Sequence, residues 1–237
     1  MESLKIQGLE IVVYNIEKHS GEVQKLLDEY LVPTYYKRMG ITQDERLKYA
    51  HIEDILHPNL AKDPKFNKFS LVAVEKDSGE VVALGLSYLI TKQEFQEDFV
   101  DLNKRISNDQ NYSPEIRKYC QHRYAVCHPI LEYYDKFGID ELIYLEDVVT
   151  TRKYRGLGVH VAIMGVAFEK FGHEYGFLSE GMVPVEKFIT EKKFQNHEWS
   201  PIGTWVSDRW YLVNKQFSYD GYICPVFISG PVPKSKL

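Results

Sequence analysis

A basic turn with two glycines, placed between a strand-like run and a long apolar run, constrains this chain more than any other feature. Residues 141–150, ELIYLEDVVT, are apolar and rich in β-branched residues, which predicts a strand. The turn TRKYRGLG follows, and residues 159–171, VHVAIMGVAFEKF, are long and apolar enough for a buried helix. Strand, glycine turn and helix in this order are typical of sites where a helix N-terminus holds a phosphate.

Two common phosphate-binding motifs do not fit this turn. A P-loop requires a Gly-Lys-Ser or Gly-Lys-Thr sequence, and the 237 residues contain neither. A dinucleotide fingerprint requires G-x-G-x-x-G directly after the strand. Gly156 and Gly158 supply its first two glycines, but Val161 occupies the third place and basic residues separate the strand from the glycines. Both motifs are therefore excluded by spacing.

A third pattern fits the turn. Residues 155–160, RGLGVH, match R-x-x-G-x-[G/A] at all but the last place, which is the pyrophosphate loop of the GNAT N-acetyltransferase superfamily. Within that superfamily the chain most resembles the insect-type arylalkylamine N-acetyltransferases. The stretches ILEYYDKFGIDELIYLEDVVTTRKYRGLG and VNKQFSYDGYICPVF carry this resemblance, which covers roughly the C-terminal two thirds of the chain.

The resemblance implies a fold. It predicts one N-acetyltransferase domain over residues 1–237, of the α/β (α+β) class, with the GNAT fold. The expected sheet is single, mixed, mostly antiparallel and twisted, with about seven strands and helices on both faces. Its two central parallel strands, Tyr144–Thr151 and Phe177–Met182, are expected to splay apart. A helical insertion at about residues 92–138 is expected between a hairpin and the strand before the turn.

Local patterns predict further elements. Leu9–Tyr14 reads as a strand, Ser20 as the N-cap of a helix that Pro33 ends or bends, and Thr42 with Glu45 as a capping box that opens a second helix. Residues 68–90 read as a hairpin with a glycine turn. In the insertion, a Ser-Pro helix start at 113–114 precedes a proline at 129 that splits or kinks the helix. Residues 184–199 predict a late helix, and residues 204–229 two more strands.

The implied cofactor is acetyl-CoA, as a co-substrate. Unpaired amide groups and the helix dipole favour its diphosphate, and glycine lets the backbone approach closely. Arg152, Lys153 and Arg155 are expected to add charge-assisted contacts, including contacts to the 3′-phosphate. At His160, where the family has a small residue, packing is favoured over a cofactor contact, and both remain open. The residues expected at the cofactor are Val148, Val149, Thr150, Arg155, Gly156, Leu157, Gly158, Val159 and His160.

The resemblance also implies direct acetyl transfer to an amine, which needs a base because the amine arrives as ammonium. Strand alternation places Tyr144, Glu146, Val148 and Thr150 on one face. Glu146 is the first candidate for the base, with Tyr144 as its neighbour in a proton relay, and Asp147 on the opposite face is second. A surface carboxylate without a catalytic role is the competing interpretation of Glu146.

Two departures from the family accompany this prediction. Tyr35 stands where insect-type enzymes carry the glutamate of an Asp-Glu-Pro motif, and Ile189 stands where many members carry a thiolate-protonating tyrosine. Tyr35 and Tyr36 are instead expected to bind the acceptor. Tyr30 and Tyr134 are further aromatic candidates, although core packing is the more common fate of such residues.

The expected function is acetyl transfer to the primary amine of a small molecule, with arylalkylamines such as tyramine, dopamine or serotonin as a candidate class. The alternatives are a catalytically weak acyl-CoA-binding module and a protein N-acetyltransferase. A net charge of -5 disfavours nucleic acid and anionic membranes as partners. The expected state is a monomer or homodimer. Three cysteines without metal-site spacing indicate no metal and a reducing, cytoplasmic setting, and the N-terminus shows no signal peptide.

Overall fold

The computed structural model describes residues 6–180, 183–184, 211–214, 218–219, 222–223 and 226–231. The chain divides into two compact units. The first contains Met1–Leu89 and Leu145–Phe171, and the second contains Ile90–Tyr144 and Gly172–Leu237. The expectation of one domain over the whole chain stays a prediction.

The first unit carries strands β1 (Leu9–Val13) and β2 (Leu71–Glu75), most of β3 (Val81–Thr91) and the second half of β4 (Glu141–Thr150), hydrogen-bonded in that order. β1 pairs with β2 and β2 with β3, both antiparallel. The predicted hairpin is confirmed: Gly79 supplies the left-handed residue of its turn, with φ of 74°. Eight consecutive buried residues at the start of β3 show that both faces of this strand are covered.

The N-terminal helix begins earlier than predicted. Asn15 is the N-cap of α1 (Ile16–Leu26), because its side chain accepts a hydrogen bond from Lys18 N at 2.9 Å. The expected cap at Ser20 is therefore wrong, and Ser20 lies inside α1. A π-helical turn, η1 (Leu27–Leu31), then leads into α2 (Val32–Met39), where Pro33 stands in the first turn. The helix is interrupted, as predicted, but the break lies in η1, and Pro33 opens α2 instead of ending a helix.

The capping box at Thr42 is present, but the helix behind it is short. It opens a 3-10 turn, η2 (Gln43–Glu45), and α3 (Arg46–Tyr49). The 3-10 turns η3 (Asp54–Leu56), η4 (Leu60–Lys62) and η5 (Pro64–Asn67) follow. The burial of Ile52 and Leu56 and the proline at 58 favour a compact irregular path over a continued helix.

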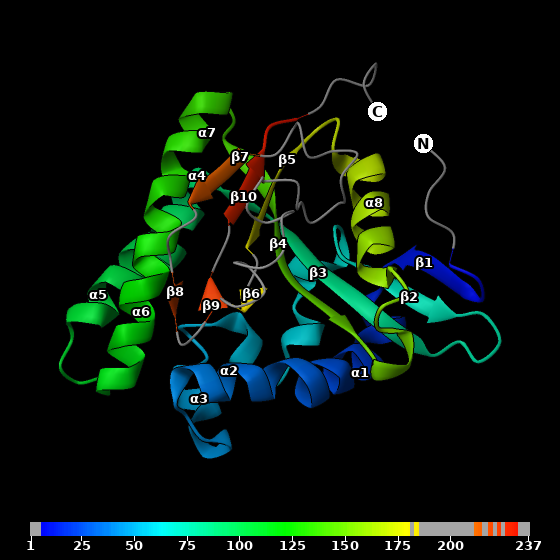
Figure 1. Ribbon diagram of the computed structural model, residues 1–237, viewed down its shortest axis with the longest axis horizontal. Coiled ribbons are helices and arrows are strands. Elements are labelled where there is room, and N and C mark those ends of the chain that lie inside the picture. Colours follow the sequence, from blue (N-terminus) through cyan, green and yellow to red (C-terminus); the bar gives the residue numbers. More distant parts are fainter. Residues whose placement is uncertain are drawn as a thin grey trace. The chain divides into compact units, whose positions relative to one another are not determined.

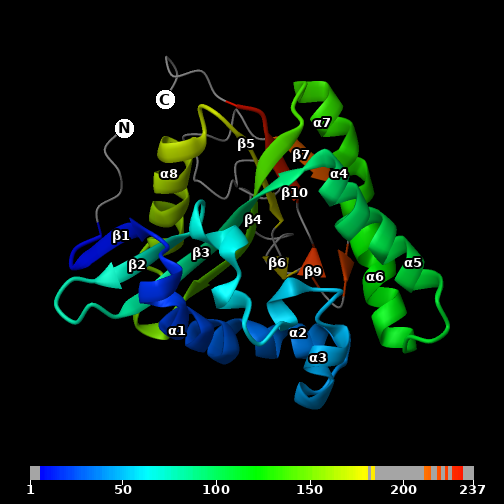
Figure 2. The same cartoon turned by 180° about the vertical axis from the view of Figure 1, so that it is seen from behind.

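Helix α8 (Val159–Phe171) packs on β1 and β2, and lies across these strands from α1 and α2 (Figures 1 and 2). Gly85 in β3 permits a close approach, because a Cβ built there would lie 2.9 Å from Ile163 Cγ2 of α8. The rings of Phe69 and Phe171 meet edge to face at 5.2 Å. α8 is therefore held tightly against the sheet within the first unit.

The second unit holds the predicted helical insertion. Its helical segments are α4 (Lys92–Phe95), η6 (Gln96–Asp101), α5 (Leu102–Asn108), α6 (Pro114–Cys127), η7 (His128–Ile130) and α7 (Leu131–Phe137). Ser113 caps α6 by accepting from Ile116 N, and the 3-10 turn at Pro129 separates α6 from α7, as predicted. Gly138 ends α7 with φ of 61°.

The second unit also carries β5 (Gly176–Glu180), β10 (Val226–Ser229) and β7 (Tyr211–Asn214), antiparallel in that order, and a small sheet of β6 (Val183–Pro184), β9 (Tyr222–Ile223) and β8 (Ser218–Tyr219). The main sheet has seven strands among the described residues, and the predicted mixed α/β class is confirmed. The helix predicted after residue 184 and the end of the strand at Met182 lie outside the described residues. The expected splay of β4 from β5 stays a prediction.

Candidate functional site

The glycine turn leaves the first amide groups of α8 open. After the 3-10 turn η8 (Arg152–Tyr154), Gly156 and Gly158 both adopt φ of 78°, and α8 begins at Val159. Ala162 N donates to Gly158 O at 3.0 Å, so the amide groups of residues 159–161 precede the first helical hydrogen bond. Positive charge from the helix dipole gathers at the same end. This geometry suits an anion.

The two glycines are required by conformation, and they keep the space above the loop open. A Cβ built at Gly156 or Gly158 meets no heavy atom within 4 Å. Side chains other than glycine are nonetheless disfavoured, because the backbone is left-handed at both positions.

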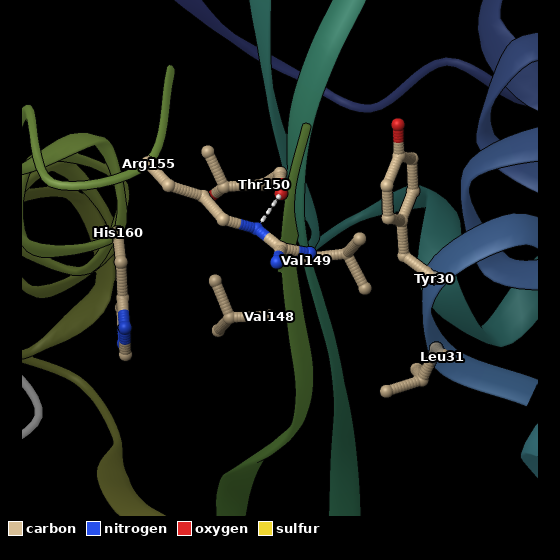
Figure 3. Close-up of a pocket in the computed structure, with 7 residues that line it drawn as sticks. All are labelled: Tyr30, Leu31, Val148, Val149, Thr150, Arg155 and His160. Carbon is tan, nitrogen blue, oxygen red and sulfur yellow. Dashed lines mark hydrogen bonds between the residues drawn. The ribbon is translucent and has the colours of Figure 1, made fainter. Parts of the chain in front are cut away.

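Two cavities flank this loop, both within the first unit. One has a volume of about 290 Å³ and the other about 280 Å³. Thr150, Arg155 and His160 line both. The first cavity is also lined by Tyr30, Leu31, Val148 and Val149, as Figure 3 shows, and the second by Tyr154, Gly156, Gly158 and Val159. Leu157 lines neither and is 56% exposed.

Arg155 is fixed in the first cavity by two neighbours. Its Nε donates to Thr150 O at 3.0 Å, and its guanidinium lies 5.4 Å from the ring centre of Tyr30 (Figure 3). Tyr30 comes from η1, so a π-helical turn contributes to this wall. The sequence placed Tyr30 among possible acceptor contacts, and the structure places it opposite Arg155.

Lys153 and His160 differ from expectation. Lys153 Nζ lies 2.7 Å from Glu75 Oε1, and Tyr154 also hydrogen-bonds this carboxylate. Hydrogen bonds from Lys153, Ser78 and Tyr154 lower the pKa of Glu75 to about 2. Lys153 therefore anchors the loop to β2 and is compensated by a carboxylate. The favoured packing of His160 is wrong, because its side chain is exposed and lines both cavities.

The Glu146 carboxyl on β4 lies in an acidic environment. The residue is half-buried, but its Oε2 is sealed from solvent and has no hydrogen-bond partner in the described part of the chain. Burial raises the pKa of Glu146 well above its usual value, and Asp54 raises it further while Lys65 opposes the shift. Asp147 and Glu53 act in the same direction as Asp54. A carboxyl in this state can hold a proton near neutral pH.

The neighbours of Glu146 include residues that sequence reasoning missed. Glu53 and Asp54 follow α3, where the sequence suggested only a helix continuing from the Thr42 capping box. Tyr35, a predicted acceptor contact, donates a weak hydrogen bond to Asp147 at 3.4 Å. Tyr36 is half-buried and lines neither cavity. Only the acidic character of residues 53–54 could have hinted at this cluster.

Two tyrosines singled out in the sequence belong to the second unit. Tyr144 is buried, receives a weak hydrogen bond from Arg123 Nη2 at 3.5 Å, and meets the ring of Phe99 edge to face at 5.1 Å. Tyr134 is fully buried and donates to Ile90 O at 3.5 Å, so it cannot touch an acceptor. Ile189 lies outside the described residues.

Neither a family model nor a curated protein matches the sequence. Solved structures do match. Arylalkylamine N-acetyltransferase 2 from Aedes aegypti matches with a TM-score of 0.61 and 12% identity, over 95% of this chain and 100% of that one. The chain has the GNAT acetyltransferase fold.

Two further structures carry the same fold. Putative arylalkylamine N-acetyltransferase 7 from the yellow fever mosquito has a TM-score of 0.58 at 12% identity, over 94% of this chain and 88% of that one. A Drosophila melanogaster polyamine N-acetyltransferase, which forms N-acetylagmatine, has a TM-score of 0.57 at 8% identity, over 94% and 99%. Within the described residues, no helix has the length and apolarity to cross a membrane, and no group of three His, Cys, Asp or Glu residues is placed to hold a metal ion.

Proposed function

We propose that this protein is an acetyl-CoA-dependent N-acetyltransferase that acetylates the primary amine of a small molecule. One observation carries the proposal: the open amide groups at the start of α8 and the buried Glu146 carboxyl belong to the turn and strand of one continuous segment, residues 146–161. The fold shared with N-acetyltransferases supports it.

The residues around the loop fit coenzyme A. The amide groups of residues 159–161 and the Arg155 guanidinium provide donors for a diphosphate, and the space above Gly156 and Gly158 is open. The β4 residues Val148, Val149 and Thr150 line the adjoining cavity, where pantetheine is expected to run. When bound, acetyl-CoA supplies the acetyl thioester.

We assign Glu146 the task of removing the acceptor's proton. A primary amine is mainly ammonium at neutral pH and must lose a proton before it can attack. A carboxyl whose pKa is raised by burial is a better match for this task than an exposed one. Asp147, held by Tyr35, is the second candidate.

The proposed acceptors are arylalkylamines. Tyr35 beside Asp147 offers an aromatic ring next to negative charge, a combination that suits an aromatic ammonium compound. Tyr30 adds a second ring at the cavity, beside Arg155. Tyr36 is retained as a candidate contact. We place the protein in the cytoplasm, as a monomer or homodimer, in keeping with the buried thiols of Cys120 and Cys127.

A second candidate function is an acyl-CoA-binding module with little turnover. The observation that favours it is Tyr35, which stands where insect-type enzymes carry a glutamate. Calorimetry with acetyl-CoA and thiol release with a panel of aromatic and aliphatic amines separate the two. Transfer to any amine excludes the binding module, binding without transfer excludes the enzyme, and no binding at high micromolar acetyl-CoA excludes both.

The Glu146→Gln variant tests the assigned base. We expect kcat to fall about 10²-fold or more, because a positioned base contributes roughly 10²–10⁴-fold. The dissociation constant of acetyl-CoA should stay within about two-fold, because Glu146 lines neither cavity. Asp147→Asn is the matched control on the neighbouring position. A larger loss of kcat in that variant would transfer the role to Asp147.

A further inference from the structure

Lys65 lies beside the acidic cluster in a fixed position. It belongs to η5, whose N-cap Asp63 accepts a hydrogen bond from Lys65 N at 2.9 Å. Its Nζ forms an ion pair with the carboxylate of Asp54. The same ammonium lies 4.2 Å from the ring centre of Tyr88 and 5.0 Å from that of Phe66. Two aromatic faces and one carboxylate thus hold this side chain, which is 30% exposed.

The ammonium stays charged in this environment. Burial acts to lower the pKa of Lys65, but Glu146, Asp54 and Asp63 outweigh it, so the pKa lies above its ordinary value. The interaction is mutual, because Lys65 also lowers the pKa of Glu146. Among the described charged groups that act most strongly on Glu146, Lys65 is a cation, and Glu53, Asp54 and Asp147 are anions.

This cluster poses an electrostatic problem for a base. Three carboxyls and burial all favour the protonated form of Glu146, and a protonated carboxyl cannot accept a second proton from an amine. The Oε2 atom has no hydrogen bond in the described structure to compensate for a negative charge. Some positive charge is needed to keep the carboxylate form accessible at neutral pH.

We propose that Lys65 is a positioning residue that keeps Glu146 in its proton-accepting form, with Asp54 and the rings of Tyr88 and Phe66 holding the ammonium in place. The inference rests on the proposed function, since it assigns a partner to the proposed base. Lys65 acts through Glu146 and needs no contact with the acceptor. A merely structural Lys65 would affect stability and leave the titration of Glu146 unchanged.

The direct test is a titration of Glu146 by carbon-13 NMR in protein labelled at the glutamate carboxyl carbons. Loss of one signal in Glu146→Gln assigns the resonance. In Lys65→Met we expect the titration midpoint of Glu146 to move to higher pH, because the cation that favours its carboxylate is removed. In Lys65→Arg the positive charge is kept, so the midpoint should stay near that of the wild type.

Lys92→Met provides the matched control. Lys92 also pairs with an aspartate, Asp135, at 2.6 Å, but this pair belongs to the second unit. Its removal should leave the Glu146 midpoint unchanged. An unmoved midpoint in Lys65→Met would overturn the inference. If Lys65→Met does not fold, Lys65→Gln is titrated in its place, and an unmoved Glu146 midpoint in that variant overturns the inference.

An activity measurement follows the same logic. In Lys65→Met we expect kcat/KM at pH 7 to fall about ten-fold or more and to recover toward higher pH, since a nearby opposite charge typically shifts a carboxyl by one or more pH units. Lys65→Arg should retain the wild-type profile. Absence of transfer to every amine in the wild type would refute the proposed function alone, because the NMR titration still reports on Lys65. A uniform loss at all pH values would count against the inference.

Discussion

His19 is a buried histidine near the N-terminus of α1, where it is 4% exposed. Its Nδ1 accepts a hydrogen bond from Asn15 N at 3.0 Å, which fixes the neutral tautomer, and its Nε2 has no partner among the described residues. Burial lowers the pKa of His19, with Lys18 acting in the same direction and Glu22 against it. The fold therefore favours the neutral imidazole.

We expect the free energy of unfolding to fall in mild acid because of His19. Because the pKa of His19 is lower in the folded than in the unfolded state, the unfolded chain takes up the proton first as the pH falls below about 6.5. His19 therefore contributes to the free energy of unfolding above that pH, and this contribution is lost as the pH falls below it. For one proton, the free energy of unfolding changes by at most about 1.4 kcal/mol per pH unit. Urea unfolding between pH 7.5 and 5 should show that the free energy of unfolding declines less with falling pH in His19→Gln than in the wild type.

Lys18→Met supplies an internal check on this prediction. Removing the neighbouring cation should raise the pKa of His19 and make the decline slightly shallower than in the wild type. Equal declines in the wild type and His19→Gln would contradict the assignment.

Single residues show where sequence reasoning works and where it stops. Strand alternation placed Glu146 on one face of β4 with Tyr144, Val148 and Thr150, and the family resemblance singled it out among them. Lys65 and Asp54 could not be predicted as its neighbours, because they lie about 80 to 90 residues away along the chain and meet it only through folding. The apolar helical pattern around His160 likewise could not predict that its side chain is exposed.

At the scale of elements, the contact between β3 and α8 depends on one missing side chain. A Cβ at Gly85 would lie 2.9 Å from Ile163 Cγ2 and 4.0 Å from Val148 Cγ2. Ile163 is buried and β-branched, so it has little freedom to turn aside. Gly85→Ala should reduce the free energy of unfolding by about 1–3 kcal/mol, the usual cost of overpacking, as measured by urea unfolding.

Gly21→Ala is the opposite case on another element. Gly21 lies inside α1, and a Cβ there meets no atom within 4 Å. This substitution should stabilise the protein by about 0.5–1 kcal/mol, because alanine favours the helix and glycine does not. If both alanine variants changed stability equally, packing at Gly85 would not be the cause of its effect.

Elements with a strong local signal were predicted well. The hairpin around Gly79, the helix after Ser113 and its interruption at Pro129 follow from turn, cap and proline chemistry. The failures have tertiary causes. Asn15, not Ser20, caps α1, because the helix begins directly after β1 ends. The helix opened by Thr42 is short, because the chain beyond it buries Ile52 and Leu56.

For the whole molecule, charge does not explain attraction to an anionic cofactor. The net charge is -5, and Lys153 in the loop is already paired with Glu75. Affinity must then come from local donors, namely the amide groups at the start of α8 and Arg155. Binding to the folded state alone should raise global stability by mass action.

Acetyl-CoA at about 100 times its dissociation constant should raise the free energy of unfolding by about 2.7 kcal/mol. Gly158→Ala and Gly79→Ala form a matched pair for testing the source of this gain. Their φ angles are 78° and 74°, and a Cβ meets no atom at either, so each should lose about 1–2 kcal/mol without cofactor.

The pair should differ once acetyl-CoA is added. Gly79 lies in the β2–β3 hairpin and lines neither cavity, so Gly79→Ala should keep the full gain. Gly158 lines the second cavity, where the diphosphate is expected, and a methyl group there would enter open space beside it, so Gly158→Ala should lose most of this gain. Thermal and urea unfolding, each with and without acetyl-CoA, measure the gain in stability of both variants. An equal gain in the two variants would mean that the cofactor is held elsewhere, since only one of these otherwise similar glycines lies where its phosphates are expected.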